Sequence, residues 1–425
     1  MMDSTLPLLL KGYAWLPDRH RREGSWPVHT RLAGRRALAL HGPDAVRWFY
    51  DEHNVVREGA LPGPLLDTLF GRGAVHTLDG GAHRVRKSLF MAELKDAGGL
   101  RDLSDRLARE WDRTVAAWPG RDRVVLFDEV SEIITRAVCD WAGVALPAGP
   151  DGSRHLAADL VAMVDGFATA GPRHFRARRA RARQEARIAE LVTAERRRAG
   201  TGTETGGPSV KAATAFAAVA HHRDADGALL DPHTAAVEVL NVIRPTVAVS
   251  WYVAFAAHAL HRWPEQRERL AAGDPARALA FAQEVRRFYP FAPFVAGLAA
   301  DTAQWDGRPV PAGTMVVLDL YGHDHDPALF PDPYAFDPGR FLDRAPGRDE
   351  LVPQGGGDPA TGHRCPGEDV TLAVLATLTP RLARLAYDVP EQDLRIPLNR
   401  MPTRPRSGFV LTDVRTNARE TDAAG

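Results

Sequence analysis

A glycine-rich stretch around a single cysteine is the feature that most constrains how this chain can fold. Residues 352–368 hold four glycines ahead of Cys365, then Pro366, and an apolar helical pattern begins at Val370. Because proline is favoured in the first turn of a helix, this order predicts Cys365 at a helix N-terminus. Free backbone N–H groups and the positive end of the helix dipole favour the thiolate there. The glycines let the backbone fold closely around the sulfur.

The loop by itself leaves three roles open for Cys365. A nucleophilic cysteine needs a histidine base across the site. A soft-metal site usually needs further cysteines, and the chain has one other, Cys139. An axial thiolate on haem iron needs a single cysteine. Haem ligand, nucleophile and structural cysteine are therefore the alternatives that the rest of the chain must decide.

Composition and charge limit the classes of protein to consider. The chain has 425 residues, enough for a large core, with 54 basic and 54 acidic residues. A net charge of zero gives no general attraction to nucleic acid or to an anionic membrane. Two cysteines exclude a disulfide framework and indicate a reducing compartment. The apolar start at 6–10 is short and follows Asp3, so we expect no signal peptide and a cytoplasmic protein.

The longest apolar stretch, 234–260, is long enough to cross a bilayer. It carries four residues that disfavour a membrane span: Glu238, Asn241, Arg244 and Pro245. We therefore expect a core helix and no membrane span.

Helical periodicity dominates the chain, with a smaller β portion. Helices are predicted at 45–51, 100–117, 126–144, 156–167, 234–262 and 277–289, short strands at 294–320, and a terminal hairpin at 395–412. The arginine-rich run 173–187 is predicted to be a solvated helix face, with a nucleic-acid or partner patch as the alternative. Residues 200–208 are predicted to be a flexible surface loop. The fold class is mainly α with a minor β portion.

Two further motifs precede the cysteine loop. Glu284 and Arg287 stand three residues apart on one helix face, and Arg340 follows in a Phe-Asp-Pro-Gly-Arg-Phe context. Alone, such an acid–base pair is usually a surface ion pair. The order of the three motifs is more specific: a Glu-x-x-Arg helix, an arginine among proline and phenylalanine, and a glycine-rich cysteine loop. In this order the sequence resembles the cytochrome P-450 superfamily of haem-thiolate enzymes over nearly its whole length.

The resemblance implies one haem-thiolate domain over residues 1–425, with haem b as the cofactor and Cys365 as the axial ligand of its iron. Glu284, Arg287 and Arg340 would form a buried network that braces the cysteine loop, since buried charges persist when they are paired. His83, Lys87 and His363 fall where the family binds the haem propionates. For His83 and Lys87, four residues apart, an exposed helix pair is the alternative.

The long apolar helix departs from the usual pattern of the family. Where most members carry an acid followed by an alcohol, this chain has Arg244-Pro245, with Thr246 one position later. The absence of the acid–alcohol pair at this position argues against activation of dioxygen with electrons from a reductase. Proline inside a helix costs about 3 kcal/mol and frees the carbonyl four residues back, so a kink is expected.

Arg244 has no acidic neighbour one helical turn away, and Glu238 is expected on another side of the helix. An unpaired guanidinium is too costly to bury without an anion. Either another segment of the chain supplies a carboxylate, or a ligand does. A carboxylate ligand suits the planar fork of the arginine.

Other segments narrow the resemblance to the bacterial fatty-acid peroxygenase branch of the superfamily. They are Asn-Val-Ile-Arg-Pro-Thr at 241–246, Phe-Gly-Arg-Gly-Ala-Val-His at 70–76, Met-Val-Asp-Gly-Phe at 163–167, Tyr-Pro-Phe-Ala-Pro at 289–293 and Arg-Met-Pro at 400–402. The resemblance implies that hydrogen peroxide oxidises long-chain fatty acids at the α or β carbon without an obligatory redox partner. The substrate carboxylate, held by Arg244 beside Pro245, would act as the acid–base group.

His76 and two phenylalanines complete the expected site. His76 would lie over the haem, where it would assist decarboxylation to a terminal alkene or only hydrogen-bond within its loop. Phe70 and Phe167 would be walls of the substrate pocket. The rival functions are a conventional reductase-dependent monooxygenase and a non-enzymatic haem or lipid carrier.

Overall fold

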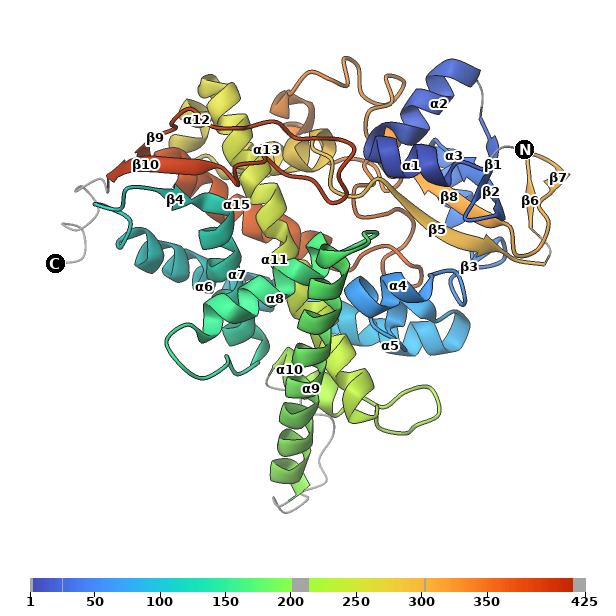
Figure 1. The fold of residues 1–425 in the computed structure, drawn as a ribbon, viewed down its shortest axis with the longest axis horizontal. Coiled ribbons are helices and arrows are strands. Elements are labelled where there is room, and N and C mark those ends of the chain that lie inside the picture. Colours follow the sequence, from blue (N-terminus) through green and yellow to red (C-terminus); the bar gives the residue numbers. More distant parts are fainter. Residues whose placement is uncertain (1–2, 25, 201–213, 302, 416–425) are drawn as a thin grey trace.

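The computed structural model describes residues 3–24, 26–200, 214–301 and 303–415, so the part of the predicted surface loop at 201–208 lies outside it. Helices make up most of the regular structure, as predicted (Figure 1). The α-helices are α1 (Thr5–Lys11), α2 (Trp15–Glu23), α3 (Pro43–Phe49), α4 (Gly63–Leu65), α5 (Gly80–Leu94), α6 (Ala97–Val115), α7 (Leu126–Ala142), α8 (Gly152–Asp165), α9 (Pro172–Gly200), α10 (Ala215–Ala220), α11 (Pro232–Arg262), α12 (Pro264–Ala271), α13 (Pro275–Phe288), α14 (Leu320–His323) and α15 (Glu368–Arg384). Four short helical segments are η1 (Gly12–Ala14), the π-helical η2 (Leu66–Phe70), η3 (Val75–Thr77) and η4 (Pro338–Phe341).

The β portion consists of short strands. They are β1 (Val28–Leu32), β2 (Arg35–Leu40), β3 (Val55–Val56), β4 (Val124–Val125), β5 (Phe294–Ala299), β6 (Gln304–Trp305), β7 (Arg308–Pro309), β8 (Met315–Asp319), β9 (Ala386–Asp388) and β10 (Val410–Arg415). The main sheet has the order β1-β2-β8-β5-β3. Strand β8 lies in its middle, parallel to β2 (Leu38 opposite Val316) and antiparallel to β5 (Val295 opposite Leu318).

The predicted terminal hairpin at 395–412 is wrong. Strand β10 pairs antiparallel with β9 and with β4, so its partners come from residues 386–388 and 124–125. The intervening segment is irregular and carries backbone bonds such as the one from the Arg406 N–H to the Arg395 carbonyl (3.1 Å). A hairpin assumes that the nearest extended segments pair, and here the neighbour in space is more distant in sequence.

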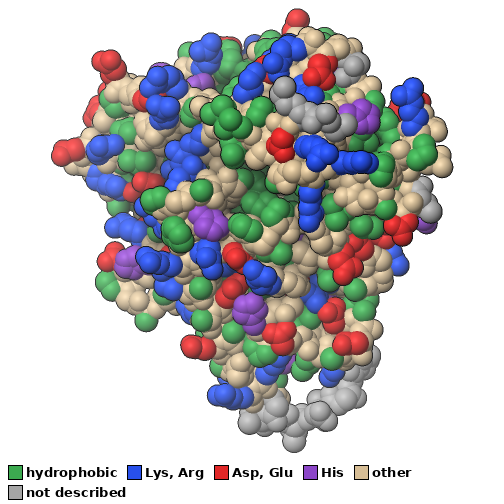
Figure 2. All heavy atoms as spheres, turned by 45° about the vertical axis from the view of Figure 1, so that its right-hand side comes forward, with side chains coloured by type: hydrophobic (Ala, Val, Ile, Leu, Met, Phe, Trp, Pro, Cys, Tyr) green, Lys and Arg blue, Asp and Glu red, His purple; other side chains and the backbone are tan. Residues whose placement is uncertain are grey.

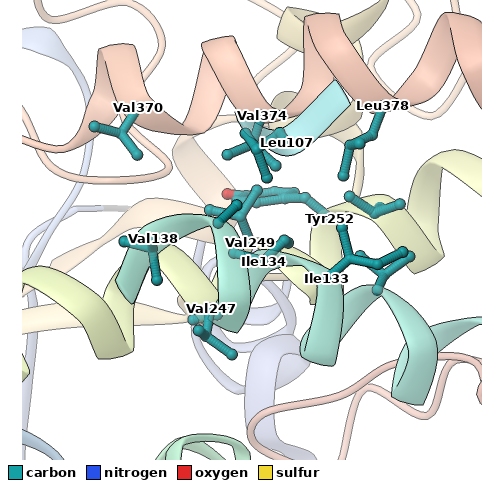
Figure 3. Close-up of a cluster of buried hydrophobic side chains, with 14 of the residues drawn as sticks. Leu107, Ile133, Ile134, Val138, Val247, Val249, Tyr252, Val370, Val374 and Leu378 are labelled. Atoms are coloured by element: carbon teal, nitrogen blue, oxygen red, sulfur yellow. The ribbon is translucent and has the colours of Figure 1, made fainter. Parts of the chain in front are cut away.

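Helix α11 runs through the centre of the helical part (Figure 1). It packs against α7, α9, α15 and α8. Of its most apolar 18-residue window, 94% is buried inside the protein, which confirms the predicted core helix. Figure 3 shows side chains from α6, α7, α11 and α15 pointing toward one another, among them Ile134, Val249 and Val374. This packing holds α11 rigidly beside the helix that follows the cysteine loop.

Helix α9 contains the arginine-rich run, and three of the run's seven arginines are ion-paired: Arg173 with Asp165 (3.0 Å), Arg181 with Glu185 (2.6 Å) and Arg183 with Asp159 (2.5 Å). Most of the remaining arginines are exposed, as expected for a solvated helix face. Arg181 is an exception to the predicted solvated face, because its side chain is buried. Figure 2 shows basic and acidic side chains interspersed over one face of the molecule, which agrees with the net charge of zero.

Candidate active site

The cysteine loop lies at the N-terminus of α15, but slightly farther from the helix than predicted. Helix α15 begins at Glu368 with Gly367 as its N-cap, so Pro366 precedes the helix instead of occupying its first turn. The Cys365 N–H donates to the Gln354 carbonyl (3.2 Å), which closes the loop on itself. The Cys365 side chain lines the large internal cavity of the protein.

The glycines of the loop are needed for packing against α3 and not, as predicted, for contact with the sulfur. A Cβ on Gly356 would lie 2.1 Å from a methyl carbon of Val46, and one on Gly357 would lie 2.7 Å from Cβ of Tyr50. Gly357 also has a φ of +74°, which side chains rarely adopt. Gly367 is the glycine whose added Cβ would face the sulfur, at 3.7 Å.

Glu284, Arg287 and Arg340 come together in the interior. Both carboxylate oxygens of Glu284 accept hydrogen bonds from Arg287 at 2.7 Å, and Nε of Arg340 lies 3.9 Å away. The network reaches the cysteine loop through one intermediate residue. Arg287 donates to the carbonyl of Asp324 (3.0 Å), whose carboxylate accepts from the N–H of Val352 (2.9 Å).

A second set of charges touches the cysteine loop directly and was not predicted. Arg286 is fully buried; it is ion-paired with Glu368 and donates to the side-chain oxygen of Gln354 (3.2 Å). Arg364, next to the cysteine, donates to the other oxygen of Glu368 (2.7 Å). The signal in the sequence was available, because Arg286 lies inside the Glu-x-x-Arg motif and Glu368 follows Cys365 by three positions.

Three basic side chains meet on one side of the cavity: His83, Lys87 and His363. The two histidine rings stack at 3.9 Å, and Nζ of Lys87 donates to the carbonyl of Arg364 (2.6 Å). Burial and the neighbouring His363 lower the pKa of His83 to about 3, and burial lowers the pKa of Lys87 to about 8. Among the described residues, Nδ1 of His83 is buried without a hydrogen-bond partner, and Oε1 of Glu52 lies 3.8 Å from it. His83 and Lys87 are buried, so the exposed helix pair is not what forms.

Arg244 also lines this cavity and is buried. Its Nη2 donates to the side-chain oxygen of Asn241 (3.2 Å), and its Nε has no hydrogen-bond partner in the described part of the chain. No carboxylate of the described residues lies within 4.0 Å of the guanidinium. Burial, followed by the positive charge of Arg181, lowers the pKa of Arg244 to about 9. Within these residues the alternative of an internal carboxylate partner is therefore not realised.

Pro245 and Thr246 also line the cavity, and α11 continues through the proline. The Thr246 hydroxyl donates to the carbonyl of Val242 (2.9 Å), one turn earlier. This bond satisfies the hydroxyl within its own helix, so the threonine is not held as a free proton donor toward the cavity.

His76, Phe70 and Phe167 form a cluster on the cavity wall. The Phe70 ring lies 5.0 Å from His76 and 6.3 Å from Phe167. Burial, followed by the charge of Arg244, lowers the pKa of His76 well below its usual value. The imidazole is therefore neutral, and its buried Nδ1 has no hydrogen-bond partner among the described residues.

The residues present fit a thiolate-ligated haem. Cys365 and the basic cluster border one cavity, and among the described residues Lys87 has no carboxylate within 4.0 Å, although Asp79 lies 3.3 Å from His363 and Glu52 lies 3.8 Å from His83. A porphyrin carries two carboxylates, and their charge would favour the protonated forms of His83, Lys87 and His363. Cys139, by contrast, is buried in the hydrophobic core, where burial raises the pKa of its thiol to about 12. One cysteine thus faces the cavity, as an axial ligand requires.

Comparison with known proteins agrees with this geometry. The family model described as cytochrome P-450 matches residues 279–399. Among curated relatives, cyclooctat-9-en-7-ol 5-monooxygenase of Streptomyces melanosporofaciens is 38% identical over 103 residues, 24% of this chain and 22% of that protein. Human cytochrome P-450 4A11 is 33% identical over 136 residues, 30% of this chain and 25% of that protein. The matched region thus spans about a quarter of these relatives.

Solved structures match over the whole fold. Cytochrome P-450SP alpha (CYP152B1) in complex with (R)-ibuprophen has a TM-score of 0.90 and 41% identity, with 97% of this chain and 99% of that chain covered. A variant of cytochrome P-450 OleT in complex with arachidonic acid has a TM-score of 0.91 and 35% identity, with 99% and 98% covered. Cytochrome P-450EX alpha (CYP152N1) with myristic acid has a TM-score of 0.88 and 37% identity, with 98% of both chains covered. The chain belongs to the cytochrome P-450 family, in the branch that these CYP152 structures represent.

Proposed function

We propose that this protein uses hydrogen peroxide to oxidise long-chain fatty acids at the α or β carbon, with Arg244 holding the substrate carboxylate. The observation that carries the proposal is a buried guanidinium without a carboxylate partner in the described chain, facing the cavity that Cys365 also lines. Two of the similar structures hold fatty acids, myristic acid and arachidonic acid. A carboxylate is the anion that the arginine fork binds best.

The chain's own residues would act mainly by binding and positioning. When bound, the haem with its Cys365 thiolate supplies the cleavage of the peroxide O–O bond and the oxidation of a C–H bond. Arg244 fixes the carboxylate end of the substrate, which presents the α and β carbons to the reaction. The carboxylate takes a proton from the peroxide oxygen that reacts and returns it to the oxygen that leaves as water. Fatty acid and peroxide thus give 2- or 3-hydroxy acid and water.

His76, Phe70 and Phe167 would close the cavity around the carboxylate end. Because His76 is neutral, its role in this proposal is to hydrogen-bond and exclude water, not to donate a proton as an acid. Decarboxylation, in which acid and peroxide give a terminal alkene, carbon dioxide and two waters, is the second route open to this site. Mass spectrometry of the products measures the ratio of the two routes directly.

One experiment tests the proposal. The purified holoenzyme with hexadecanoic acid and hydrogen peroxide, and no reductase, should form hydroxy acids. Arg244→Ala should abolish product, and Arg244→Lys should retain a fraction of it, because lysine keeps the charge but not the fork. Product formed only with a reductase and NAD(P)H would indicate a conventional monooxygenase. Bound haem and fatty acid with no turnover under either condition would indicate a carrier.

A further inference from the structure

Glu238 is a fully buried carboxylate that the proposed mechanism leaves unused. It lies on α11 between the substrate arginine and the start of the helix. One of its oxygens accepts from the N–H of Val75 (2.8 Å) and from Nη1 of Arg86 (2.7 Å). The other oxygen accepts from the side-chain NH₂ of Asn241 (2.9 Å). These are three donors from three parts of the chain: the first residue of η3, α5 and α11 itself.

The carboxylate fixes which way the Asn241 amide faces. A carboxylate can only accept hydrogen bonds, so the NH₂ end of the amide must point at Glu238. The oxygen end then points the other way and accepts from Nη2 of Arg244 (3.2 Å). Burial raises the pKa of Glu238, but the arginine and the other donors that converge on it suit the ionised form. The charge of Glu238 thus sets the orientation of the guanidinium through one amide.

The same carboxylate also holds η3, the short helix that carries His76. It accepts from the N–H of the preceding residue, Val75, while Arg86 donates to the carbonyl of Gly73 (3.2 Å). Arg86 is anchored in turn by an ion pair with Asp224 on its other side. Glu238 therefore connects Arg244 with the segment that carries His76, and both of these side chains line the cavity.

We propose that Glu238 is a positioning residue for the substrate carboxylate, acting through Asn241 on Arg244. This inference rests on the proposed function, in which Arg244 binds that carboxylate. The rival reading is that Glu238 is only half of a structural ion pair with Arg86. The two readings differ in Glu238→Gln, a change of almost the same shape. The glutamine oxygen still accepts from Val75 and Arg86, but its NH₂ group now faces Asn241. Asn241 must then turn its oxygen toward residue 238 and its NH₂ toward Arg244, so that a donor faces a donor.

The test compares the binding of an acid and of a neutral ligand of the same length. Hexadecanoic acid and 1-hexadecanol are titrated into the holoenzyme and followed by the shift of the haem Soret band. Glu238→Gln should weaken acid binding by about tenfold or more, as expected when a hydrogen bond to a charged group is lost, with alcohol binding changed by less than about twofold. Equal weakening of both ligands, or unchanged acid binding, overturns the proposal. Asp224→Asn is the matched control, because it removes the other ion pair of Arg86 and should leave the acid-to-alcohol ratio as in the wild type.

A second variant keeps the test decisive if Glu238→Gln does not fold. Asn241→Ala leaves the bonds of Glu238 to Val75 and Arg86 in place and breaks the connection to Arg244. It should reproduce the acid-selective loss, and unchanged acid binding in Asn241→Ala overturns the proposal. The wild type and Arg244→Ala in the same titration separate this inference from the function it rests on. If the wild type does not prefer the acid, or if Arg244→Ala keeps that preference, the proposed function fails. If both behave as expected and Glu238→Gln matches the wild type, only the positioning role fails.

Discussion

Replacing Arg244 with leucine should stabilise the substrate-free protein while abolishing its activity. The structure holds this guanidinium away from solvent with one hydrogen bond, to Asn241, and with no carboxylate partner in the described chain. Its pKa is lowered from 12.5 to about 9. At about 1.4 kcal/mol per pKa unit, keeping the group charged in the folded protein costs up to about 5 kcal/mol. Leucine has a similar volume and no charge, so we expect the free energy of unfolding to rise by about 1–3 kcal/mol after allowance for screening and lost packing.

The lowered pKa of Arg244 also decides how the free energy of unfolding of the wild type changes with pH. The folded-state pKa lies below the unfolded-state value, so the unfolded chain binds this proton more tightly. The free-energy cost of keeping Arg244 charged in the folded protein is fully present below about pH 9, and it falls as the pH rises through 9 toward 12.5. The wild type should therefore gain stability relative to Arg244→Leu as the pH rises above about 9, and the difference between the two should be constant at neutral pH.

Equilibrium denaturation of both proteins, with and without hexadecanoic acid, is the assay. The acid supplies the missing anion, so at a hundred times its dissociation constant it should stabilise the wild type by about 2.7 kcal/mol and the variant by far less. Arg181→Leu is the contrasting control. Arg181 is also buried, but it is paired with Glu185 (2.6 Å) and donates to the Leu69 carbonyl (2.8 Å), so its removal should destabilise by about 3–5 kcal/mol. If Arg244→Leu unfolds at lower denaturant than the wild type, Arg244 is well paired in the folded protein and the argument for a ligand anion is refuted.

Three further predictions concern the cysteine loop and His76. Gly356→Ala should lower the free energy of unfolding by about 1–3 kcal/mol, because its Cβ meets Val46, and adding Val46→Ala should recover part of this loss in a double-mutant cycle. Arg286→Gln should destabilise the protein by about 3 kcal/mol and speed haem loss, because it leaves Glu368 with fewer partners beside the cysteine loop. The rate of haem transfer to an acceptor apoprotein measures the loss, and an unchanged rate would contradict the prediction. His76→Gln should retain most hydroxylation and change mainly the ratio of alkene to hydroxy acid. Because His76 is neutral, wild type and His76→Gln should show the same pH profile of turnover between pH 6 and 8, and a wild-type inflection missing from the variant would contradict this.

The sequence predicted the parts of the site that depend on residue type and order. Cys365, Arg244 and the basic cluster line one cavity, and the expectation that they form one site came from the family resemblance that the order of the motifs carries. The purpose of the glycines could not be predicted in the same way. Their neighbours are Val46 on α3 and Tyr50 directly after it, about three hundred residues earlier in the chain, and no local pattern indicates such a contact. Likewise β10 pairs with β4 and β9 instead of forming a local hairpin, because pairing is decided by which strands the helical core brings together.

Glu238, Asn241 and Arg244 form a chain of hydrogen bonds on α11 that the sequence did not predict. Six residues separate Glu238 from Arg244, which puts them on different sides of a helix, and a direct ion pair is therefore excluded. The structure joins them through Asn241, three residues from each, because residues three apart are neighbours on a helix surface. An amide can do this without neutralising the cation, since it accepts from Arg244 but carries no charge of its own. A carboxylate at position 241 would have paired with the arginine and removed the need for an anionic substrate. The combination of a remote carboxylate and an intervening amide therefore orients Arg244 while leaving its charge for a ligand.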